Sequence, residues 1–289
     1  MAAQFIRRFL AFAPLALAGA LLVFSCACKV IRDPVPSPPP APGWTLLWSD
    51  DFNGAEGSSP DPSKWTFSTG GNGWGNHELE YYTNRRKNAH VTVGNLVITA
   101  RREAYTGPDG VKRAYTSARL KTKGLFSQAY GRFEASIKMP KGQGLWPAFW
   151  MLGDNIDSVP WPGCGEIDIM ENIGKEPGTV HGSLHGPGNA AKTADLTSSF
   201  TLPPGRKFSD AFHIYAVEWE PEAVRFYVDS NLYATFTKSQ WTAGPWVFDH
   251  PFFIVLNVAV GGDWPGPPDK TTVFPQQMLV DYVRVYTKN

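Results

Sequence analysis

Short runs of alternating apolar and polar residues recur along the chain from about residue 44 onward. A period of two is typical of strands with one buried face, and strand-favouring Val, Ile, Phe and Tyr are frequent in these runs. Turn residues separate them, and no long stretch has the i, i+3, i+4 spacing of an amphipathic helix. The pattern therefore predicts an all-β sandwich of antiparallel strands. The clearest predicted strands are 95–102, 130–139, 213–220, 223–230, 252–260 and 279–286.

One run, GEIDIMEN, concentrates acidic residues. On a helix, Glu166 and Asp168 would lie about 200° apart around the axis. On a strand they share one face, and the isoleucines between and after them share the other. Strict alternation would place Glu171 on the apolar face, but one extra residue, a β-bulge around Ile169-Met170, returns it to the acidic face. The run therefore predicts a bulged strand that presents three carboxyl groups together.

Three carboxyl groups on one strand face have three interpretations. Glutamates about 5–5.5 Å apart serve retaining glycosidases: one attacks the anomeric carbon, and the other donates a proton and then acts as a base on water. Asp168 between them would hydrogen-bond the nucleophile and raise a neighbouring pKa by repulsion. The same acids could bind calcium or magnesium, or form an acidic, solvated face. The pattern favours catalysis and leaves the other two interpretations open.

Composition narrows the function classes. Charged residues make up 18% of the chain and the formal net charge is +1, which argues against a nucleic-acid partner because such surfaces need clustered Lys and Arg. Trp 11, Phe 18 and Tyr 10 are high counts. These aromatic residues suit either a large core or a cleft in which flat rings stack on sugars.

The N-terminal segment indicates export. Residues 1–28 are typical of a secretory signal peptide, with a basic start and an uncharged stretch from 9 to 25. The sequence Val23-Phe24-Ser25-Cys26 resembles a bacterial lipoprotein cleavage site, which would attach lipid to Cys26 and anchor the protein to a membrane. Simple cleavage nearby and a retained anchor helix stay open. Residues 29–43 contain six prolines and predict a stiff linker, so the protein is expected to be secreted, periplasmic or held at the cell surface.

Cys164 and the pair His181 and His185 are not expected to form a disulfide or a zinc site. Cys164 is the single cysteine after the N-terminal segment, so we expect a packed thiol and no disulfide within the domain. His181 and His185 have a spacing that suits zinc on a helix. The glycines and proline of HGSLHGPG (181–188) argue against a helix there, and therefore against zinc.

The domain from 44 to 289 resembles glycoside hydrolase family 16, and within it the bacterial endo-β-1,3-glucanases of laminarinase type. The resemblance covers about residues 48–286. It rests on the E-x-D-x-x-E pattern of the acidic run and on matching stretches at 47–54, 74–83, 115–124, 130–152, 181–188 and 258–286. It implies a β-jelly roll of two antiparallel sheets with a concave substrate groove. It also implies that Glu166 is the nucleophile, Glu171 the acid/base and Asp168 the assisting aspartate.

The same resemblance implies a set of substrate-binding residues. His185 would lie beside the acid/base residue as its hydrogen-bonding neighbour, whereas His77 departs from the usual asparagine and takes no role. A strand would place Trp146 and Trp150 on one face, with core packing as the alternative for each ring. The complete set is Asn76, Arg119, Trp146, Trp150, Trp161, His185 and Trp264.

The resemblance also implies a structural calcium ion away from the groove, and no cofactor for catalysis. The matching positions are Asp51, the carbonyl of Gly94, and Asp281. Asp51 stands where glutamate is more usual, so its reach is shorter. An ordinary surface aspartate is the alternative interpretation of Asp51.

The expected function is endo-acting, retaining hydrolysis of β-1,3-glucosidic bonds in glucans such as laminarin. The same acid pair would also serve mixed-linkage β-1,3-1,4-glucan or a galactan, and transglycosylation is a further outcome. A non-catalytic glucan-recognition protein is the alternative from another class, but such relatives typically lose the glutamates that this chain keeps. A monomer is expected, because an open groove and a linker need no partner.

Overall fold

The computed structural model describes residues 43–188 and 193–289. The predictions of a signal peptide, of a lipid on Cys26 and of a linker concern residues that lie, apart from Gly43, outside this range. Within the described residues, no helix is both long and apolar enough to cross a membrane.

Two sheets account for the strands. The larger sheet has the order β15-β14-β13-β8-β17-β5-β6-β3, with β1 paired to β17 and β4 to β5. Its strands are β1 (Trp44–Asp50), β3 (Glu80–Tyr82), β4 (Ala89–Thr92), β5 (Asn95–Thr106), β6 (Lys112–Ser117), β8 (Gly131–Lys138), β13 (His213–Glu220), β14 (Ala223–Val228), β15 (Asn231–Thr237) and β17 (Gln276–Lys288). The smaller sheet has the order β12-β11-β10-β9-β16-β7-β2. Its strands are β2 (Thr66–Ser68), β7 (Arg119–Lys121), β9 (Leu145–Gly153), β10 (Glu166–Glu171), β11 (Thr179–Pro187), β12 (Thr193–Thr201) and β16 (Phe252–Val260).

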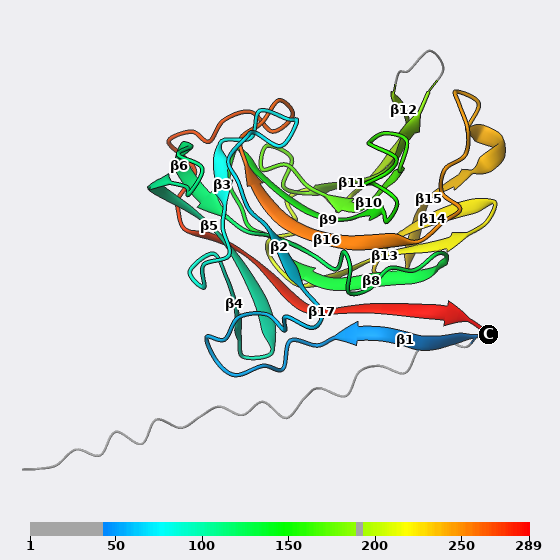
Figure 1. The fold of residues 1–289 in the computed structure, drawn as a ribbon, viewed down its shortest axis with the longest axis horizontal. Coiled ribbons are helices and arrows are strands. Elements are labelled where there is room, and N and C mark those ends of the chain that lie inside the picture. Colours follow the sequence, from blue (N-terminus) through cyan, green and yellow to red (C-terminus); the bar gives the residue numbers. More distant parts are fainter. Residues whose placement is uncertain (1–42, 189–192) are drawn as a thin grey trace, which may run out of the picture. The chain divides into compact units, whose positions relative to one another are not determined.

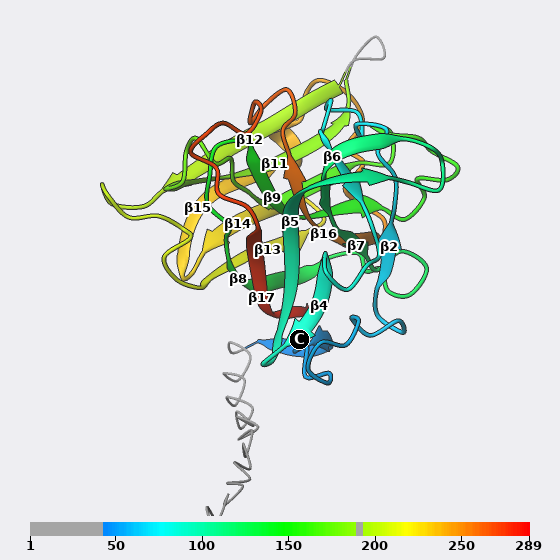
Figure 2. The same ribbon diagram turned by 90° about the vertical axis from the view of Figure 1, so that its left-hand side faces the viewer.

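The two sheets form two layers, with β9 and β16 of the smaller sheet lying over β8 and β13 of the larger one (Figure 1; Figure 2). The predicted all-β sandwich is confirmed. The pairings are antiparallel except for β3 with β6, which run parallel. The one helical element in the described residues is a short 3₁₀ turn, η2 (Lys238–Gln240). All six clearly predicted strands are present, and the segment 213–220 coincides with β13.

Alternation explains which side chains fill the space between the layers. In β8, Phe133 and Ile137 are fully buried in the core, whereas Arg132 lies on the other face and pairs with Glu134 at 2.8 Å. β16 has no such polar face, because all nine of its residues are buried. It lies between β9 and β7 in the middle of the smaller sheet, so one of its faces packs in the core and the other, including Asn257, forms part of the concave face.

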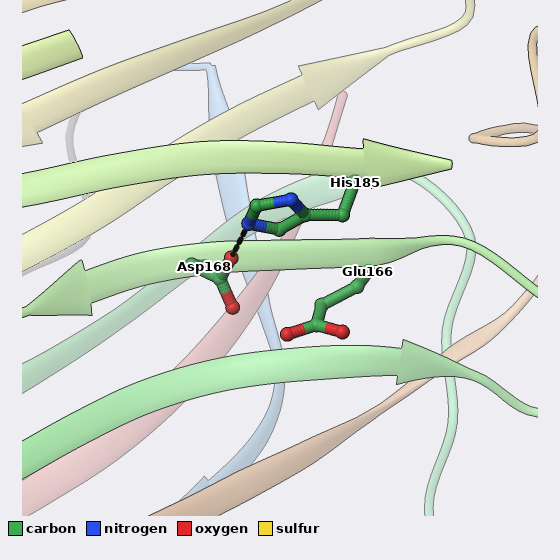
Figure 3. Close-up of side chains that lie close together, drawn as sticks. All are labelled: Glu166, Asp168 and His185. Carbon is green, nitrogen blue, oxygen red and sulfur yellow. Dashed lines mark ion pairs between the residues drawn. The ribbon is translucent and has the colours of Figure 1, made fainter. Parts of the chain in front are cut away.

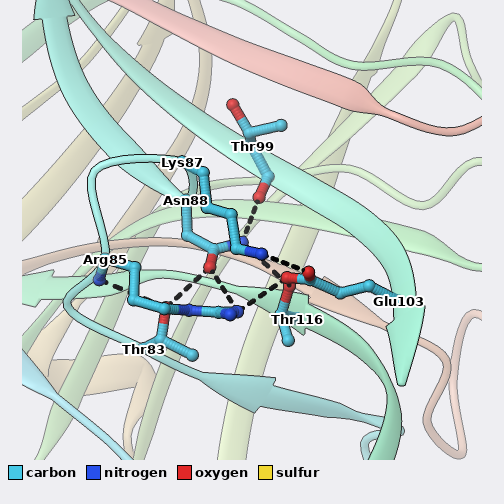
Figure 4. Close-up of polar contacts among 7 residues, drawn as sticks. All are labelled: Thr83, Arg85, Lys87, Asn88, Thr99, Glu103 and Thr116. Carbon is cyan, nitrogen blue, oxygen red and sulfur yellow. Dashed lines mark hydrogen bonds and ion pairs between the residues drawn. The ribbon is translucent and has the colours of Figure 1, made fainter. Parts of the chain in front are cut away.

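A polar cluster fastens the loop after β3 to the strands beside it (Figure 4). Asn88 is fully buried and donates to the carbonyl oxygen of Thr99 and to the hydroxyl of Thr116, both at 3.0 Å. Glu103 on β5 accepts hydrogen bonds from Arg85 at 2.6 Å and from Lys87 at 2.5 Å, and another from Thr116. These bonds hold the loop against β5 and β6.

Glu103 is expected to stabilise the fold through its charge. Burial alone would raise the pKa of Glu103, but hydrogen bonds from Lys87, Thr116 and Arg85 outweigh it and lower this pKa to about 2. Because the folded pKa lies below the unfolded value, the stabilisation is present above about pH 4.3 and is lost as the pH falls toward 2. We expect Glu103→Gln to lower the free energy of unfolding at pH 7 by about 1–3 kcal/mol, measured by urea denaturation.

The difference between wild type and Glu103→Gln should shrink below pH 4, because the wild-type side chain then gains a proton. Glu222→Gln is the matched control, since Glu222 is exposed and has one ion pair, to Lys238. A Glu103→Gln variant as stable as this control at pH 7 would contradict the assignment.

Candidate active site

A bulge in β10 brings the three motif acids onto one face. β10 pairs with β9 on one side and β11 on the other, and its register against both shifts after Asp168. Against β9, Asp168 lies opposite Trp150 and Met170 lies opposite Phe149, so Ile169 is the extra residue. The predicted bulge is confirmed. The apolar residues Ile167, Ile169 and Met170 are buried in the core.

The acids lie in a groove of about 680 Å³ on the concave face of the smaller sheet. The groove spans the sheet from β7 and β16 on one flank to β11 and β12 on the other. All seven predicted substrate-binding residues line it: Asn76, Arg119, Trp146, Trp150, Trp161, His185 and Trp264. The groove is also lined by residues for which no role was predicted: Trp74, Glu78, Ile156, Thr193, Asp195 and Asn257.

Each glutamate accepts a hydrogen bond from a tryptophan indole. Trp161, which is 48% exposed, donates to Oε2 of Glu166 at 2.7 Å. Trp146 on β9 donates to Oε1 of Glu171 at 2.9 Å. A donor fixes the direction of a carboxyl group and favours its ionised form, so both glutamates are held in place before any substrate binds.

His185 on β11 contacts Asp168 (Figure 3). The prediction had placed it beside the acid/base residue, Glu171. Its Nε2 lies 2.9 Å from Oδ2 of Asp168, and its Nδ1 lies 2.6 Å from Oδ1 of Asp195 on β12. The strand register explains the difference, because His185 lies opposite Glu166 whereas His181 lies opposite Glu171. The predicted position of His185 beside Glu171 was therefore wrong.

The electrostatics of the site keep a proton on the pair of glutamates. Burial, followed by the charge of Asp168, raises the pKa of Glu171 to about 8. Burial and Asp168 also raise the pKa of Glu166. The positive charge of His185 opposes both shifts. At neutral pH the pair therefore retains a proton, as a carboxylate–carboxylic acid pair requires.

One wall of the groove is braced by polar contacts beneath the aromatic rings. The Trp150 indole donates to Asn257 at 2.7 Å, Asn257 donates to the Tyr82 hydroxyl at 3.1 Å, and Tyr82 donates to Glu78 at 2.9 Å. The Arg119 guanidinium lies over the Trp150 ring, 4.6 Å from its centroid. Trp150 is thus a groove residue with its polar edge satisfied, and not a core side chain.

The sequence of the chain matches a known family of enzymes. The family model described as "Glycosyl hydrolases family 16" matches residues 76–284. The chain belongs to glycosyl hydrolase family 16. A beta-glucanase of Rhodothermus marinus is 46% identical over 256 residues, which cover 85% of this chain and 86% of that protein.

Solved structures of laminarinases are similar to this chain in both sequence and fold. The laminarinase catalytic domain from Thermotoga maritima is 48% identical, with a TM-score of 0.79, and the match covers 85% of this chain and 99% of that one. A LamA variant from Zobellia galactanivorans in complex with laminaritriose and laminaritetraose is 34% identical. Its TM-score is 0.75, over 84% of this chain and 99% of that one. The chain is therefore a glycoside hydrolase with the jelly-roll fold of these laminarinases.

Two tryptophans lie against each other on the Glu171 side of the family 16 groove. The Trp264 ring meets that of Trp146 edge-on, with centroids 5.4 Å apart. It also meets the ring of His181 edge-on at 5.0 Å. Trp264 comes from the loop after β16, so this contact joins residues that are far apart in the sequence. The Trp146 indole is thereby held from two sides, by Glu171 and by Trp264.

The described residues of the groove that could bind a metal ion together are Glu166, Asp168 and His185, and the histidine is not free to act as a ligand. Glu166, Asp168 and His185 offer atoms within 4.8 Å of one another, but each ring nitrogen of His185 already faces a carboxylate. The imidazole therefore has no lone pair to offer. A cationic His185 supplies the positive charge that a calcium or magnesium ion would otherwise bring to the acids.

The predicted calcium positions lie together on the larger sheet. β8 pairs along one edge of β17, the strand that contains Asp281, and β5 and β1 pair one after the other along its opposite edge. Asp51 directly follows β1, and Gly94 directly precedes β5. Arg284 donates to Oδ1 of Asp51 from Nη2 at 2.7 Å and from Nε at 3.1 Å. The fit is therefore partial, since a calcium ion would have to share Asp51 with a guanidinium, and calcium stays a prediction.

The two features expected to be inert are found in the expected surroundings. Cys164 is fully buried and unpaired, and burial raises the pKa of its thiol to about 11. It packs with Leu152 and Phe253. His181 and His185 lie on strand β11 and not on a helix. A buried thiol with a raised pKa is a poor nucleophile, which agrees with a packing role.

The hydrogen bond from Trp146 should set the alkaline limit of activity. The acid catalyst must be protonated, so activity falls as the pH rises through the Glu171 pKa of about 8. The Trp146 indole lowers that pKa, so Trp146→Phe should raise it and move the alkaline limb of kcat/KM upward by about half a unit to one unit. Trp150→Phe is the control, because the Trp150 indole donates to Asn257. A downward shift, or the same shift in the control, would refute this prediction.

Proposed function

We propose that this family 16 chain cleaves internal β-1,3-glucosidic bonds of β-glucans such as laminarin, with retention of configuration. The observation that supports this function most is the pair of glutamates on the bulged β10, each of which accepts a hydrogen bond from a tryptophan indole in the groove. The structures similar to this chain include laminarinases. The groove crosses the sheet with tryptophans on both flanks. Such a groove suits a chain bound along its length and cut in the middle.

Each group has one role in the proposed double displacement. Glu166, ionised, attacks the anomeric carbon while Glu171 gives its proton to the leaving oxygen, which forms a glycosyl ester and releases one glucan end. Glu171, now ionised, takes a proton from water, and that water attacks the same carbon and frees Glu166. Asp168 lies between the two, and its charge favours the protonated form of Glu171. No metal or cofactor takes part in these steps.

Substrate choice is tested by comparing glycans. We expect the protein to release reducing sugars and short oligosaccharides from laminarin, with less from lichenan and none from agarose or carrageenan. The Glu166→Gln variant, assayed in parallel, shows that the activity belongs to this site. Cleavage of another glycan with laminarin intact would keep the mechanism and overturn the substrate. Binding of laminarin without cleavage would favour a recognition protein.

We also propose that the protein is exported and acts as a monomer, secreted or held at the cell surface by lipid on Cys26. The support is the basic and then uncharged stretch that precedes the proline-rich linker. Mass spectrometry of the mature N-terminus tests this proposal: diacylglycerol on Cys26 supports an anchor, and a free N-terminus nearby supports simple secretion. Light scattering of the purified protein tests the monomer.

The calcium proposal is tested by metal removal. If Asp51, Gly94 and Asp281 hold calcium, a chelator should lower the melting temperature, and added calcium should restore it. Glycosidase activity well below that temperature should not change, because the positions lie on the larger sheet and not in the groove. A melting temperature that is unaffected by chelator and calcium would remove calcium from the account.

A further inference from the structure

His185 lies between carboxylates that come from two neighbouring strands. It is opposite Glu166 in the pairing of β10 with β11, and opposite Asp195 in the pairing of β11 with β12. One ring nitrogen faces Asp168 at 2.9 Å, and the other faces Asp195 at 2.6 Å. Figure 3 shows the imidazole directed at Asp168, with Glu166 alongside. The sheet register thus places an acid from outside the catalytic motif behind the histidine.

The geometry fixes the protons on His185. An ionised carboxylate can only accept hydrogen bonds, and a neutral imidazole carries a proton on one of its nitrogens alone. Two short contacts to carboxylates therefore require two N–H donors, which makes the ring an imidazolium. The pKa of His185 agrees: burial lowers it, but Asp168, and then Glu166 and Asp195, raise it to about 11.

The cation matters because Asp168 is buried among the catalytic acids. Asp168 is 2% exposed, and its charge raises the pKa of both glutamates. An uncompensated carboxylate in such a place is costly. The Nε2–H of His185 supplies a charge-assisted hydrogen bond to Asp168. The orientation of Asp168 between the glutamates therefore depends on where the imidazolium points.

We propose that Asp195 is a positioning residue for this reaction: it holds His185 as a two-proton imidazolium whose Nε2–H is aimed at Asp168. The inference rests on the proposed function and adds a residue from β12 to it. Asp195 acts through His185 and takes no part in bond making. Its carboxylate is about half exposed, at 50%, so it can be changed without leaving a cavity in the core.

A simple surface ion pair is the competing explanation, and the described part of the chain offers a matched example. His213 pairs through Nδ1 with Asp229 at 2.9 Å, close to the distance between His185 and Asp195. Asp229 lies in the turn between β14 and β15 and His213 is the first residue of β13, and neither residue lines the groove. Asp229→Asn therefore changes the same kind of contact without touching the site.

The test uses the full protein with ¹⁵N-labelled histidine and the variants Asp195→Asn, Asp195→Ala and Asp229→Asn. NMR titration reports the protons on each ring, and His185→Asn identifies the His185 signals. We expect wild-type His185 to keep both protons through pH 9. In Asp195→Asn its pKa should fall by about one unit or more, because the second carboxylate is gone.

Kinetics on laminarin at pH 6 supply the second readout. Asp195→Ala, which removes the acceptor, should lower kcat about tenfold with KM within about twofold, a loss of about 1.4 kcal/mol in the transition state. Asp195→Asn should keep most of the kcat, because its amide oxygen still accepts from Nδ1–H. Asp229→Asn should match wild type. Melting temperatures within a few degrees of wild type would show that the variants fold.

Two results would overturn the inference. An unchanged His185 titration in Asp195→Asn would show that Asp195 does not hold the charge. A wild-type kcat in Asp195→Ala would show that the contact has no consequence for the reaction. If the wild-type protein cleaved no glucan, the proposed function would fail, while the NMR titration would still decide whether Asp195 holds the imidazolium.

Discussion

Replacing Glu166 with glutamine is expected to reduce kcat on β-1,3-glucan by about four orders of magnitude or more. The amide has nearly the same shape, and its oxygen can still accept the hydrogen bond from the Trp161 indole. It cannot form the glycosyl ester, so the covalent route is closed. Because shape and contacts are kept, binding of laminarin should survive the loss of activity. Initial rates and isothermal calorimetry on the same preparation measure the two effects.

Two controls support the assignment of Glu166 as the nucleophile. Glu176→Gln alters an acid that pairs with His181 and does not line the groove, so it should leave kcat within about twofold. In Glu166→Ala, azide should attack the vacated side of the anomeric carbon and give the α-glycosyl azide. A Glu166→Gln variant with more than about one hundredth of the wild-type rate would mean that another group attacks.

Replacing Glu171 with glutamine should have an effect that depends on the leaving group. A glucan leaving group needs a proton, so kcat on laminarin should fall about 10³-fold or more. A laminari-oligosaccharide with a dinitrophenyl group in place of the next sugar needs no proton to depart. With this substrate the burst of dinitrophenol should remain fast, and the following steps should be slow, because no base activates water.

The pH profile provides a second check on Glu171. The alkaline limb near the Glu171 pKa of about 8 should disappear from the burst rate of Glu171→Gln, because no acid is left to titrate. Equal losses on laminarin and on the dinitrophenyl substrate would exclude Glu171 as the acid. Loss of the limb on its own, without the dependence on leaving group, would also be inconsistent with that role.

Local sequence was sufficient to predict the bulged strand. Glu166, Asp168 and Glu171 cannot share a face on a regular strand, and on a helix Glu166 and Asp168 would lie about 200° apart around the axis. The bulge was thus the arrangement that satisfies both conditions, and the structure has it at Ile169. The strands were also predictable from the sequence: in β13, the residues at every second position, Tyr215, Val217 and Trp219, are the ones buried in the core.

The sequence did not predict which residues lie opposite each other on neighbouring strands. The partner of His185 depends on the register of β11 against β10, and a shift of a few residues along the strand exchanges His185 with His181. Asp195 was missed for the same reason, because only the pairing of β11 with β12 places it at His185. Alternation tells which face a residue occupies, but it does not tell which residue lies across from it.

The position of Arg119 shows a similar limit. The resemblance placed it in the groove, and the guanidinium is there, with the rings of Trp74 and Trp150 at 4.8 and 4.6 Å from it. Trp74 comes from a loop and Trp150 from β9. Nothing local to Arg119 indicates that two rings from distant segments enclose it.

The anomeric configuration of the first product tests the central claim most directly. Fresh enzyme is mixed with laminarin in deuterated buffer, and proton NMR follows the new reducing ends before mutarotation mixes the anomers. The account predicts that the β-anomer appears first and the α-anomer grows in later, since Glu166 and water attack opposite faces in turn. An α-anomer that appears first would mean a single displacement by water, and would contradict Glu166 as the nucleophile.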